Sequence, residues 1–342
     1  MAEARPGLGH RPALDGLRAL AVAAVLAFHT GVLRAGWIGV DVFFALSGYL
    51  ITGLLLAEAN RFGGIRLGEF WRRRARRLFP AIALLLALIA LFDLIGSDAW
   101  RGPSRADVWG TVTYTANWVR LAEARSYWDL FTAPSPLEHV WSLAIEEQFY
   151  VVWPLVFLLA WRWRGRRGAT AAAAVLAGAF SVWQLWLGAA ASGGFERIYV
   201  GTDTRAPAFL FGALLVACAD AGGRCLRSAA RIVPLGIAAL VVAAVRFDGE
   251  ARFTYTGGLL AASTVGAITV WAAARLDRTS LPGRMLAVRP LQLVGRWSYG
   301  IYLFHWPVVV LLGAQRFDPW VQFAIVSLAS TALAAEIGRA HV

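Results

Sequence analysis

The sequence predicts an all-α integral membrane protein, a bundle of about ten transmembrane helices with both termini in the cytoplasm. Of its 342 residues, 58% are hydrophobic and only 16% are charged, a composition far from that of a soluble domain. Ten apolar stretches are long enough to be spanning helices. Arginine clusters fall in every second loop, as the positive-inside rule requires of such a bundle.

In chain order the expected spans cover residues 14–31, 38–56, 81–95, 140–161, 169–191, 206–221, 232–245, 254–274, 300–313 and 320–335. They lack the alternating pattern of a membrane β-barrel, so helices rather than strands should cross the membrane. The first stretch has the basic flank of a secretory signal peptide. However, Arg18 and His29 interrupt it and no small-x-small cleavage site follows, so we expect it to remain as the first helix.

The net charge of +12 raises the possibility of nucleic-acid binding, but the basic residues follow the topology instead. All 33 are arginines. The clusters are Arg72, Arg73, Arg74, Arg76 and Arg77, then Arg162, Arg164, Arg166 and Arg167, then Arg224, Arg227 and Arg231, and finally Arg275, Arg278, Arg284 and Arg289. Membrane insertion and attraction to anionic lipid explain them, so we expect membrane lipids and not nucleic acid as partners.

The first expected helix carries Arg18 and His29, which are eleven residues apart. Eleven steps of about 100° return to nearly the same face, and they separate the two residues by roughly 16 Å along the helix. With the amino terminus inside, Arg18 lies near the cytoplasmic surface and His29 in the outer half of the membrane. Histidine is suited to taking and returning a proton, although a hydrogen bond to a neighbouring helix would explain His29 equally well.

The stretch HVWSLAIEEQFYVVWPLVFLLAW, residues 139–161, places Glu146 about two turns into the membrane, at a depth comparable with that of His29. A carboxylate at that depth is costly unless it is paired. We therefore expect Glu146 to orient and charge His29, with Ser142 one turn earlier on the same face. These three residues are the catalytic candidates. The neighbouring Glu147 is the alternative carboxylate, and it could instead bind an arginine or cap a helix.

Further polar side chains occur in or beside the other spans. The segment FWRRRARRLFPA, residues 70–81, carries five arginines that could either set the topology or bind the phosphates of a cytoplasmic substrate. Asp203 and Arg205 lie at the outer mouth of the sixth span, most simply as an ion pair. The candidates for substrate binding are Asp41, Asp203, Arg205, Tyr302 and His305. We expect no metal site, since the two cysteines lack the neighbours that zinc requires.

Six segments in order resemble the membrane-bound acyltransferase-3 family, the bacterial enzymes that O-acetylate surface polysaccharides. They are RPALDGLRALAVAAVLAFH, GWIGVDVFFALSGYLIT, FWRRRARRLFPA, HVWSLAIEEQFYVVWPL, GTDTRAPAFLFGALL and GRWSYGIYLFHWPVV. The resemblance implies a ten-helix enzyme of the bacterial cytoplasmic membrane. Such an enzyme takes an acyl group, usually acetyl, from acyl-CoA inside the cell. It delivers the group to an outward-facing hydroxyl of a glycan, lipid-linked sugar or glycolipid.

The resemblance also implies roles for particular residues. Arg18 and His29 match an Arg-x10-His motif in which the histidine is the catalytic base, and Ser142 and Glu146 match the motif of the fourth helix. The arginines at positions 72, 73, 74, 76 and 77, with Arg18, are the expected binding site for coenzyme A. A transporter is the alternative, because polar groups at mid-membrane depth also mark transport pathways, but we find no inverted repeat to support it.

The carboxyl end departs from the family pattern. The chain closes with STALAAEIGRAHV, and EIGRAHV is what a common sequencing adapter encodes when it is read in frame. We therefore expect residues 1–335 to form the transmembrane domain and residues 336–342 to be an artefactual tail.

Overall fold

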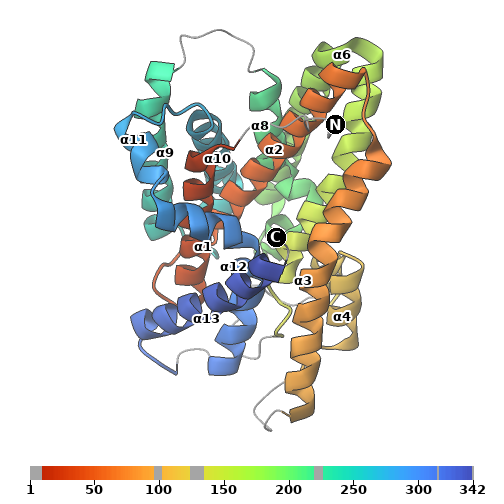
Figure 1. The fold of residues 1–342 in the computed structure, drawn as a ribbon. Helices are drawn as coiled ribbons and strands as arrows, with labels where there is room; N and C mark the ends of the chain where they lie inside the picture. The colour runs from red at the N-terminus through yellow and green to blue at the C-terminus, as the bar shows by residue number, and fades with distance from the viewer. Residues whose placement is uncertain (1–9, 96–101, 124–134, 219–225, 314–315, 341–342) are drawn as a thin grey trace.

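The computed structural model describes residues 10–95, 102–123, 135–218, 226–313 and 316–340, and its regular secondary structure within them is helical (Figure 1). The long helices are α1 (Pro12–His29), α2 (Ile38–Phe62), α3 (Leu67–Ile95), α6 (Val140–Ala190), α8 (Thr202–Ala217), α9 (Leu226–Arg246), α10 (Leu259–Ala273), α12 (Arg289–Leu312) and α13 (Pro319–Ala340). The short ones are α4 (Arg105–Val112), α5 (Ala116–Ala122), α7 (Glu196–Val200) and α11 (Leu281–Leu286), and a π-helical turn, Thr254–Gly258, leads into α10.

Six of the described helices are long and apolar enough to cross a membrane: α1, α2, α3, α6, α9, and α10 together with its π-helical turn. Each of the ten predicted stretches coincides largely with helix wherever the structure describes it. Two of them, residues 140–161 and 169–191, lie within α6. The structure therefore confirms a helical multi-pass bundle, whereas the count of ten spans and the cytoplasmic position of the termini stay predictions.

α6 reverses its direction midway. Arg164 (φ −143°, ψ 28°) and Gly165 (φ 54°, ψ −140°) leave the helical region, and the positive φ of Gly165 suits a residue without a Cβ. Shortly after, Gly168 passes so close to an earlier turn that a Cβ there would lie 2.1 Å from the carbonyl oxygen of Ala160. The two predicted spans on either side of this point therefore lie next to each other.

The centre of the bundle depends on close helix crossings. α2 packs most extensively against α8, and α1 against α12. At the first crossing, a Cβ on Gly48 would lie 1.9 Å from the carbonyl oxygen of Phe209, and one on Gly212 would lie 2.2 Å from that of Ala45. Glycine on both helices thus lets the two backbones touch, as is common between helices in membranes.

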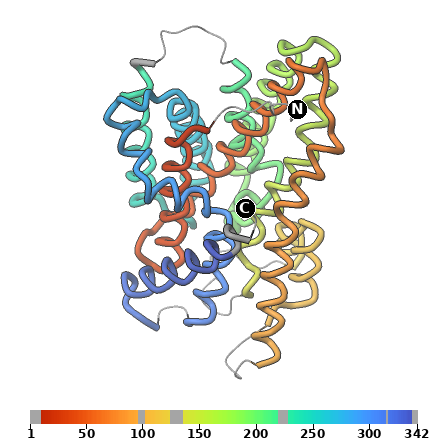
Figure 2. Tube along the Cα trace, viewed as in Figure 1, coloured from red at the N-terminus to blue at the C-terminus, as the bar shows by residue number. Residues whose placement is uncertain are grey.

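α3 runs along the outside of the bundle beside α6 (Figure 2). Its second half exposes large apolar side chains, among them Leu84, Leu91, Leu94 and Ile95, which suits a helix facing lipid. Its first half turns Phe70, Leu78 and Ile82 inward. This amphipathic arrangement brings one face of the arginine-rich start of α3 against the interior.

Candidate active site

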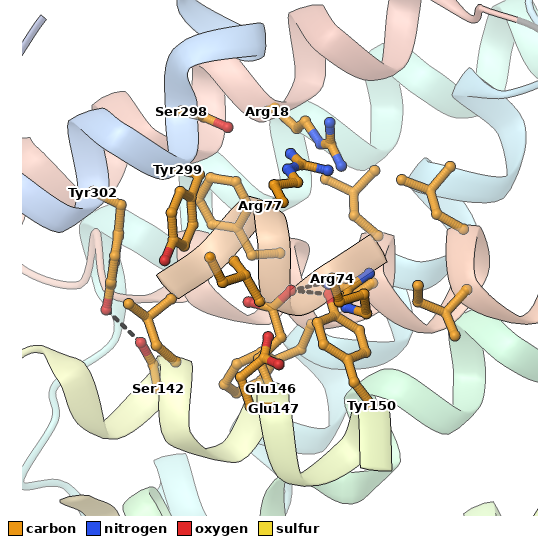
Figure 3. Close-up of a pocket in the computed structure, with 18 of the residues that line it drawn as sticks. Arg18, Arg74, Arg77, Ser142, Glu146, Glu147, Tyr150, Ser298, Tyr299 and Tyr302 are labelled. Carbon is orange, nitrogen blue, oxygen red and sulfur yellow. Dashed lines mark hydrogen bonds between the residues drawn. The ribbon is translucent and has the colours of Figure 1, made fainter. Parts of the chain in front are cut away.

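A cavity of about 240 Å³ lies among α1, α2, α3, α6 and α12, and the turn between α4 and α5 adds Tyr114 to its wall (Figure 3). Apolar side chains such as Val40, Phe43, Leu50 and Leu78 form much of the lining. The polar lining residues are Arg18, Ser47, Arg74, Arg77, Tyr114, Ser142, Glu146, Glu147, Tyr150, Ser298, Tyr299 and Tyr302. Three arginines and two glutamates therefore share one largely apolar space.

Helical spacing divides the five arginines of α3. Arg74 and Arg77 are one turn apart and both line the cavity, where Arg77 and Arg18 face the two glutamates (Figure 3). Arg73 instead pairs outside the cavity, 3.4 Å from Glu69 and 3.8 Å from Glu58, and neither Arg72 nor Arg76 lines the cavity. Of the predicted coenzyme A ligands, the structure brings together Arg18, Arg74 and Arg77 and separates the other three.

Two polar atoms of the cavity wall are buried without a hydrogen-bond partner in the described structure: Nε of Arg74 and the hydroxyl of Tyr114. The Arg74 guanidinium lies 3.3 Å from the centre of the Tyr150 ring, a cation–π contact that holds it in place. Tyr114 has the left-handed backbone angle φ 54°, and Gln148 donates to its carbonyl oxygen at 2.7 Å. Burial raises the pKa of Tyr114, so its hydroxyl remains a donor. These atoms give the cavity unsatisfied hydrogen-bonding capacity.

The Glu146 carboxylate accepts hydrogen bonds from the hydroxyls of Ser47 and Tyr150, and the Tyr150 hydroxyl also lies 2.7 Å from Ser47 Oγ. These hydroxyls come from α2 and from one turn further along α6. Glu146 thus belongs to the middle of the cavity, near Arg74. Ser47 and Tyr150 were not among the residues predicted from the sequence, because a hydroxyl in an apolar span carries no distinctive signal.

A second histidine contacts the ring of His29. His29 Nδ1 lies 3.0 Å from Nε2 of His305 on α12, and the ring centres are 5.0 Å apart. The ring of His139, at the start of α6, meets that of His305 edge-on at 5.5 Å between centres, and its Nε2 contacts the carbonyl oxygen of Leu303 at 3.0 Å. All three rings are buried. His139 was missed as a candidate, although the cost of burying an ionisable ring could have identified it.

The expected hydrogen-bonded pair of His29 and Glu146 is therefore wrong as a description of the contacts: Glu146 binds hydroxyls and His29 binds His305. Helical geometry placed the two residues at similar depth, but depth does not determine which helices are neighbours. α1 packs along α12, so the nearest ionisable ring comes from α12.

A hydrogen-bonded contact connects the cavity to these histidines. Ser142 Oγ lies 2.5 Å from the Tyr302 hydroxyl, and both residues line the cavity (Figure 3). The Tyr302 ring is also 5.2 Å from that of His305, and its hydroxyl donates to the carbonyl oxygen of His139 at 3.1 Å. Ser142 and Tyr302 thus form the wall between the cavity and the histidine cluster.

The remaining substrate-binding candidates lie away from the cavity. Arg205 donates to Asp41 at 3.0 Å and Ser263 donates to the same carboxylate at 2.6 Å, a buried contact that ties α2, α8 and α10 together. Asp203 binds Arg197 through two hydrogen bonds of 2.8 and 2.6 Å. The expected ion pair of Asp203 with Arg205 is therefore wrong, because Asp203 pairs with Arg197 and Arg205 pairs with Asp41.

Within the described residues, no group of three or more histidine, cysteine, aspartate or glutamate side chains is placed to hold a metal ion. The site is instead a cavity lined by arginine side chains, and the buried histidine rings lie behind its wall at Ser142 and Tyr302. An all-helical bundle whose described part includes six helices able to cross a membrane is a multi-pass membrane protein. A family model described as an acyltransferase domain matches residues 11–338, and the chain belongs to this family, the acyltransferase-3 family.

Curated relatives agree with this assignment. The chain is 35% identical over 344 residues to the peptidoglycan O-acetyltransferase OatA of Listeria monocytogenes, covering 95% of this chain and 54% of the relative. It is 36% identical over 313 residues to the putative peptidoglycan O-acetyltransferase YrhL of Bacillus subtilis, covering 88% and 49%. The O-acetyltransferase OatA of Staphylococcus aureus is 34% identical over 343 residues, covering 95% and 55%. The chain thus spans about half the length of these relatives. No solved structure matches the chain.

Proposed function

We propose that this protein transfers an acetyl group from acyl-CoA in the cytoplasm to a hydroxyl of a cell-wall glycan outside the membrane, with peptidoglycan as the acceptor class. The observation that carries the proposal is the shape of the site. One cavity holds Arg18, Arg74 and Arg77, and its wall at Ser142 and Tyr302 contacts the buried histidine cluster. The acceptor class follows from the relatives, two of which are named as peptidoglycan O-acetyltransferases.

The three arginines support a phosphate-bearing donor. Guanidinium groups bind phosphate oxygens through paired hydrogen bonds, and Arg74 Nε has no partner of its own in the described structure. Glu146 and Glu147 keep the cavity from becoming an indiscriminate anion site, because they reduce its net positive charge. The apolar wall formed by residues such as Phe43 and Leu50 suits the uncharged arm that carries a thioester.

The chemistry we propose is direct transfer with His29 as the general base. His29 takes the proton of the acceptor hydroxyl, and the oxygen attacks the thioester carbonyl carbon. The carbon–sulfur bond then breaks, and the thiol leaves with the proton returned by His29. We favour this route over a covalent acyl-enzyme because the residues that line the described cavity include no cysteine, and the chain contains no lysine.

Replacing His29 by alanine tests this role. Purified protein in liposomes would be given acetyl-CoA and a soluble peptidoglycan fragment, and release of free coenzyme A and acetylation of the fragment would be measured. We expect His29→Ala to abolish both while the protein remains in the membrane, since the base is lost. The matched control is His10→Ala, which removes an exposed histidine outside the cavity and should leave both readouts intact.

Retained transfer by His29→Ala would refute the role of His29. Wild-type protein that consumes no thioester, but moves the fragment across the liposome membrane, would instead support a transporter.

A further inference from the structure

Glu146 and Glu147 are neighbours in the cavity, but they differ in their hydrogen bonds (Figure 3). The Glu146 carboxylate accepts from the hydroxyls of Ser47 and Tyr150. The Glu147 carboxylate receives no hydrogen bond and forms no ion pair within the described part of the chain. Glu147 is only partly buried, so its oxygens can accept from a group that enters the cavity.

Tyr114 supplies a complementary group. Its hydroxyl is buried without a hydrogen-bond partner in the described structure, and its side chain lines the same cavity. Burial and, after it, the negative charge of Glu147 raise the pKa of Tyr114, so the hydroxyl keeps its hydrogen and the two groups interact electrostatically. The cavity thus contains an unused donor and an unused acceptor, and buried polar groups of this kind call for a partner.

The position of Tyr114 is fixed by its surroundings. Among the described residues it is the only non-glycine residue with a left-handed φ, 54°, which a residue with a Cβ rarely adopts. Gln148, the residue after Glu147, donates to the Tyr114 carbonyl oxygen at 2.7 Å and to Asn117 Oδ1 at 3.0 Å. Thr202 donates in turn to Gln148 Oε1 at 2.5 Å. Strained backbone that its surroundings maintain occurs mainly at ligand-binding and active sites.

We propose that Tyr114 and Glu147 form a subsite for the acceptor sugar, in which Tyr114 donates to a sugar oxygen and Glu147 accepts from a sugar hydroxyl. The proposal deepens the proposed function and rests on it for the identity of the acceptor. A sugar hydroxyl can both donate and accept, so a sugar satisfies both protein groups. The phosphates of the donor suit this subsite poorly, because the charge of Glu147 repels them.

Tyr114 also enters the cavity from the end that suits an acceptor. It follows α4, which lies at the end of the bundle opposite the connection between α2 and α3 (Figure 1). The arginine-rich start of α3 comes directly after that connection. In the proposed function the donor comes from the cytoplasm and the acceptor from outside, so the two substrates reach the cavity from opposite ends.

Direct binding tests the subsite without requiring catalysis. The purified protein in lipid nanodiscs, in which both faces are accessible, would be titrated calorimetrically with the soluble peptidoglycan fragment and, separately, with coenzyme A. We expect Tyr114→Phe to raise Kd for the fragment about fivefold, because only a hydroxyl is lost, and Glu147→Gln about tenfold, because a charged acceptor is lost. Neither variant should weaken the binding of coenzyme A. Glu147→Gln should strengthen it slightly, since a negative charge leaves the cavity.

Tyr49→Phe and Glu69→Gln are the matched controls. They make the same chemical changes at residues that do not line the cavity, so both dissociation constants should stay unchanged. The transfer assay gives a second readout. Tyr114→Phe and Glu147→Gln should raise KM for the fragment but not KM for acetyl-CoA, whereas a variant that merely folds poorly would bind both substrates less well.

Unchanged binding of the fragment to either cavity variant would overturn the subsite, and so would a wild type that does not bind the fragment. Weaker binding of coenzyme A, alone or together with the fragment, would also overturn it, because the two residues would then serve the donor or the fold. A wild type that binds the fragment, with weaker binding in both variants but no acetyl transfer, would support the subsite and refute the proposed function.

Discussion

Arg74 and Arg77 both line the cavity because they are one helical turn apart, whereas Arg72 and Arg76 of the same arginine run do not line it. The two groups are chemically identical and lie within six residues of each other. Any difference between their variants therefore reports on position and not on charge. This provides an internal comparison for the proposed donor site.

Removing a cavity arginine should weaken the binding of the donor. We expect Arg74→Gln or Arg77→Gln to raise KM for acetyl-CoA about tenfold, since a hydrogen bond to a charged group contributes ~1.5–3 kcal/mol. Arg72→Gln and Arg76→Gln should leave it nearly unchanged. Steady-state thioester assays with the four purified variants would measure this. Equal effects at all four positions would show that the run acts only as a diffuse basic surface.

Asp41 and Arg205 form a buried ion pair, and we expect it to matter for stability rather than for substrate. Asp41→Asn keeps the shape of the side chain but leaves the Arg205 charge buried and uncompensated, a change that typically costs about 3–5 kcal/mol. Asp203→Asn is the control, because the ion pair of Asp203 is partly exposed and should contribute less than about 1 kcal/mol. Thermal unfolding of the detergent-solubilised variants measures the difference. Equal midpoints for both variants would contradict this assignment.

At the scale of elements, the crossing of α2 and α8 depends on two glycines whose added Cβ atoms would meet backbone oxygen. Backbone cannot move aside as a side chain can, so the helices must separate. Gly48 and Ser47 are neighbours in sequence, which means that the same crossing positions a hydroxyl partner of Glu146. Packing between helices and geometry within the cavity are thereby coupled.

Adding a methyl group at this crossing should destabilise the protein. We expect Gly48→Ala and Gly212→Ala each to cost about 1–3 kcal/mol, the usual penalty for overpacking a core. Gly178→Ala on α6 is the control: a Cβ there meets nothing within 4 Å, and alanine favours a helix by ~0.5–1 kcal/mol. Thermal unfolding would compare the three. Stability unchanged by Gly48→Ala would mean that the crossing is looser than described.

At the scale of the whole molecule, the arrangement of the loops defines two ends of the bundle. The reversal of α6 and the connection between α2 and α3 lie at one end, and α4 lies at the other (Figure 1). The first end holds the arginine-rich segments around positions 61–77 and 162–167. We propose that this end is cytoplasmic, because an excess of arginine marks cytoplasmic loops.

Single cysteines test the orientation. In a background with Cys218 and Cys225 replaced by serine, Thr113→Cys should react with a membrane-impermeant thiol reagent added to intact cells. Arg162→Cys should react only after the membrane is opened, and both positions are exposed on the protein itself. The reverse pattern would overturn the orientation, and with it the proposal that the donor binds from the cytoplasm.

Much of this protein follows from local features of the sequence. Apolar length predicted the helices, because a span must satisfy its backbone hydrogen bonds internally and so shows itself in a continuous segment. The burial cost of charge then identified Arg18, His29, Glu146 and His305 as residues that need an explanation. The order of the motifs predicted the family, which the family comparison confirmed.

Tertiary structure alone decided which of these residues meet. Periodicity gives the depth and face of a residue on its own helix, but helices that are far apart in sequence choose their neighbours through close packing. α1 therefore placed His29 against His305, and α6 placed Glu146 against Ser47 and Tyr150. The sequence by itself determined which side chains are buried in the membrane. The packing of the helices determined the partner of each buried group, because such contacts depend on the whole bundle and not on any one segment of it.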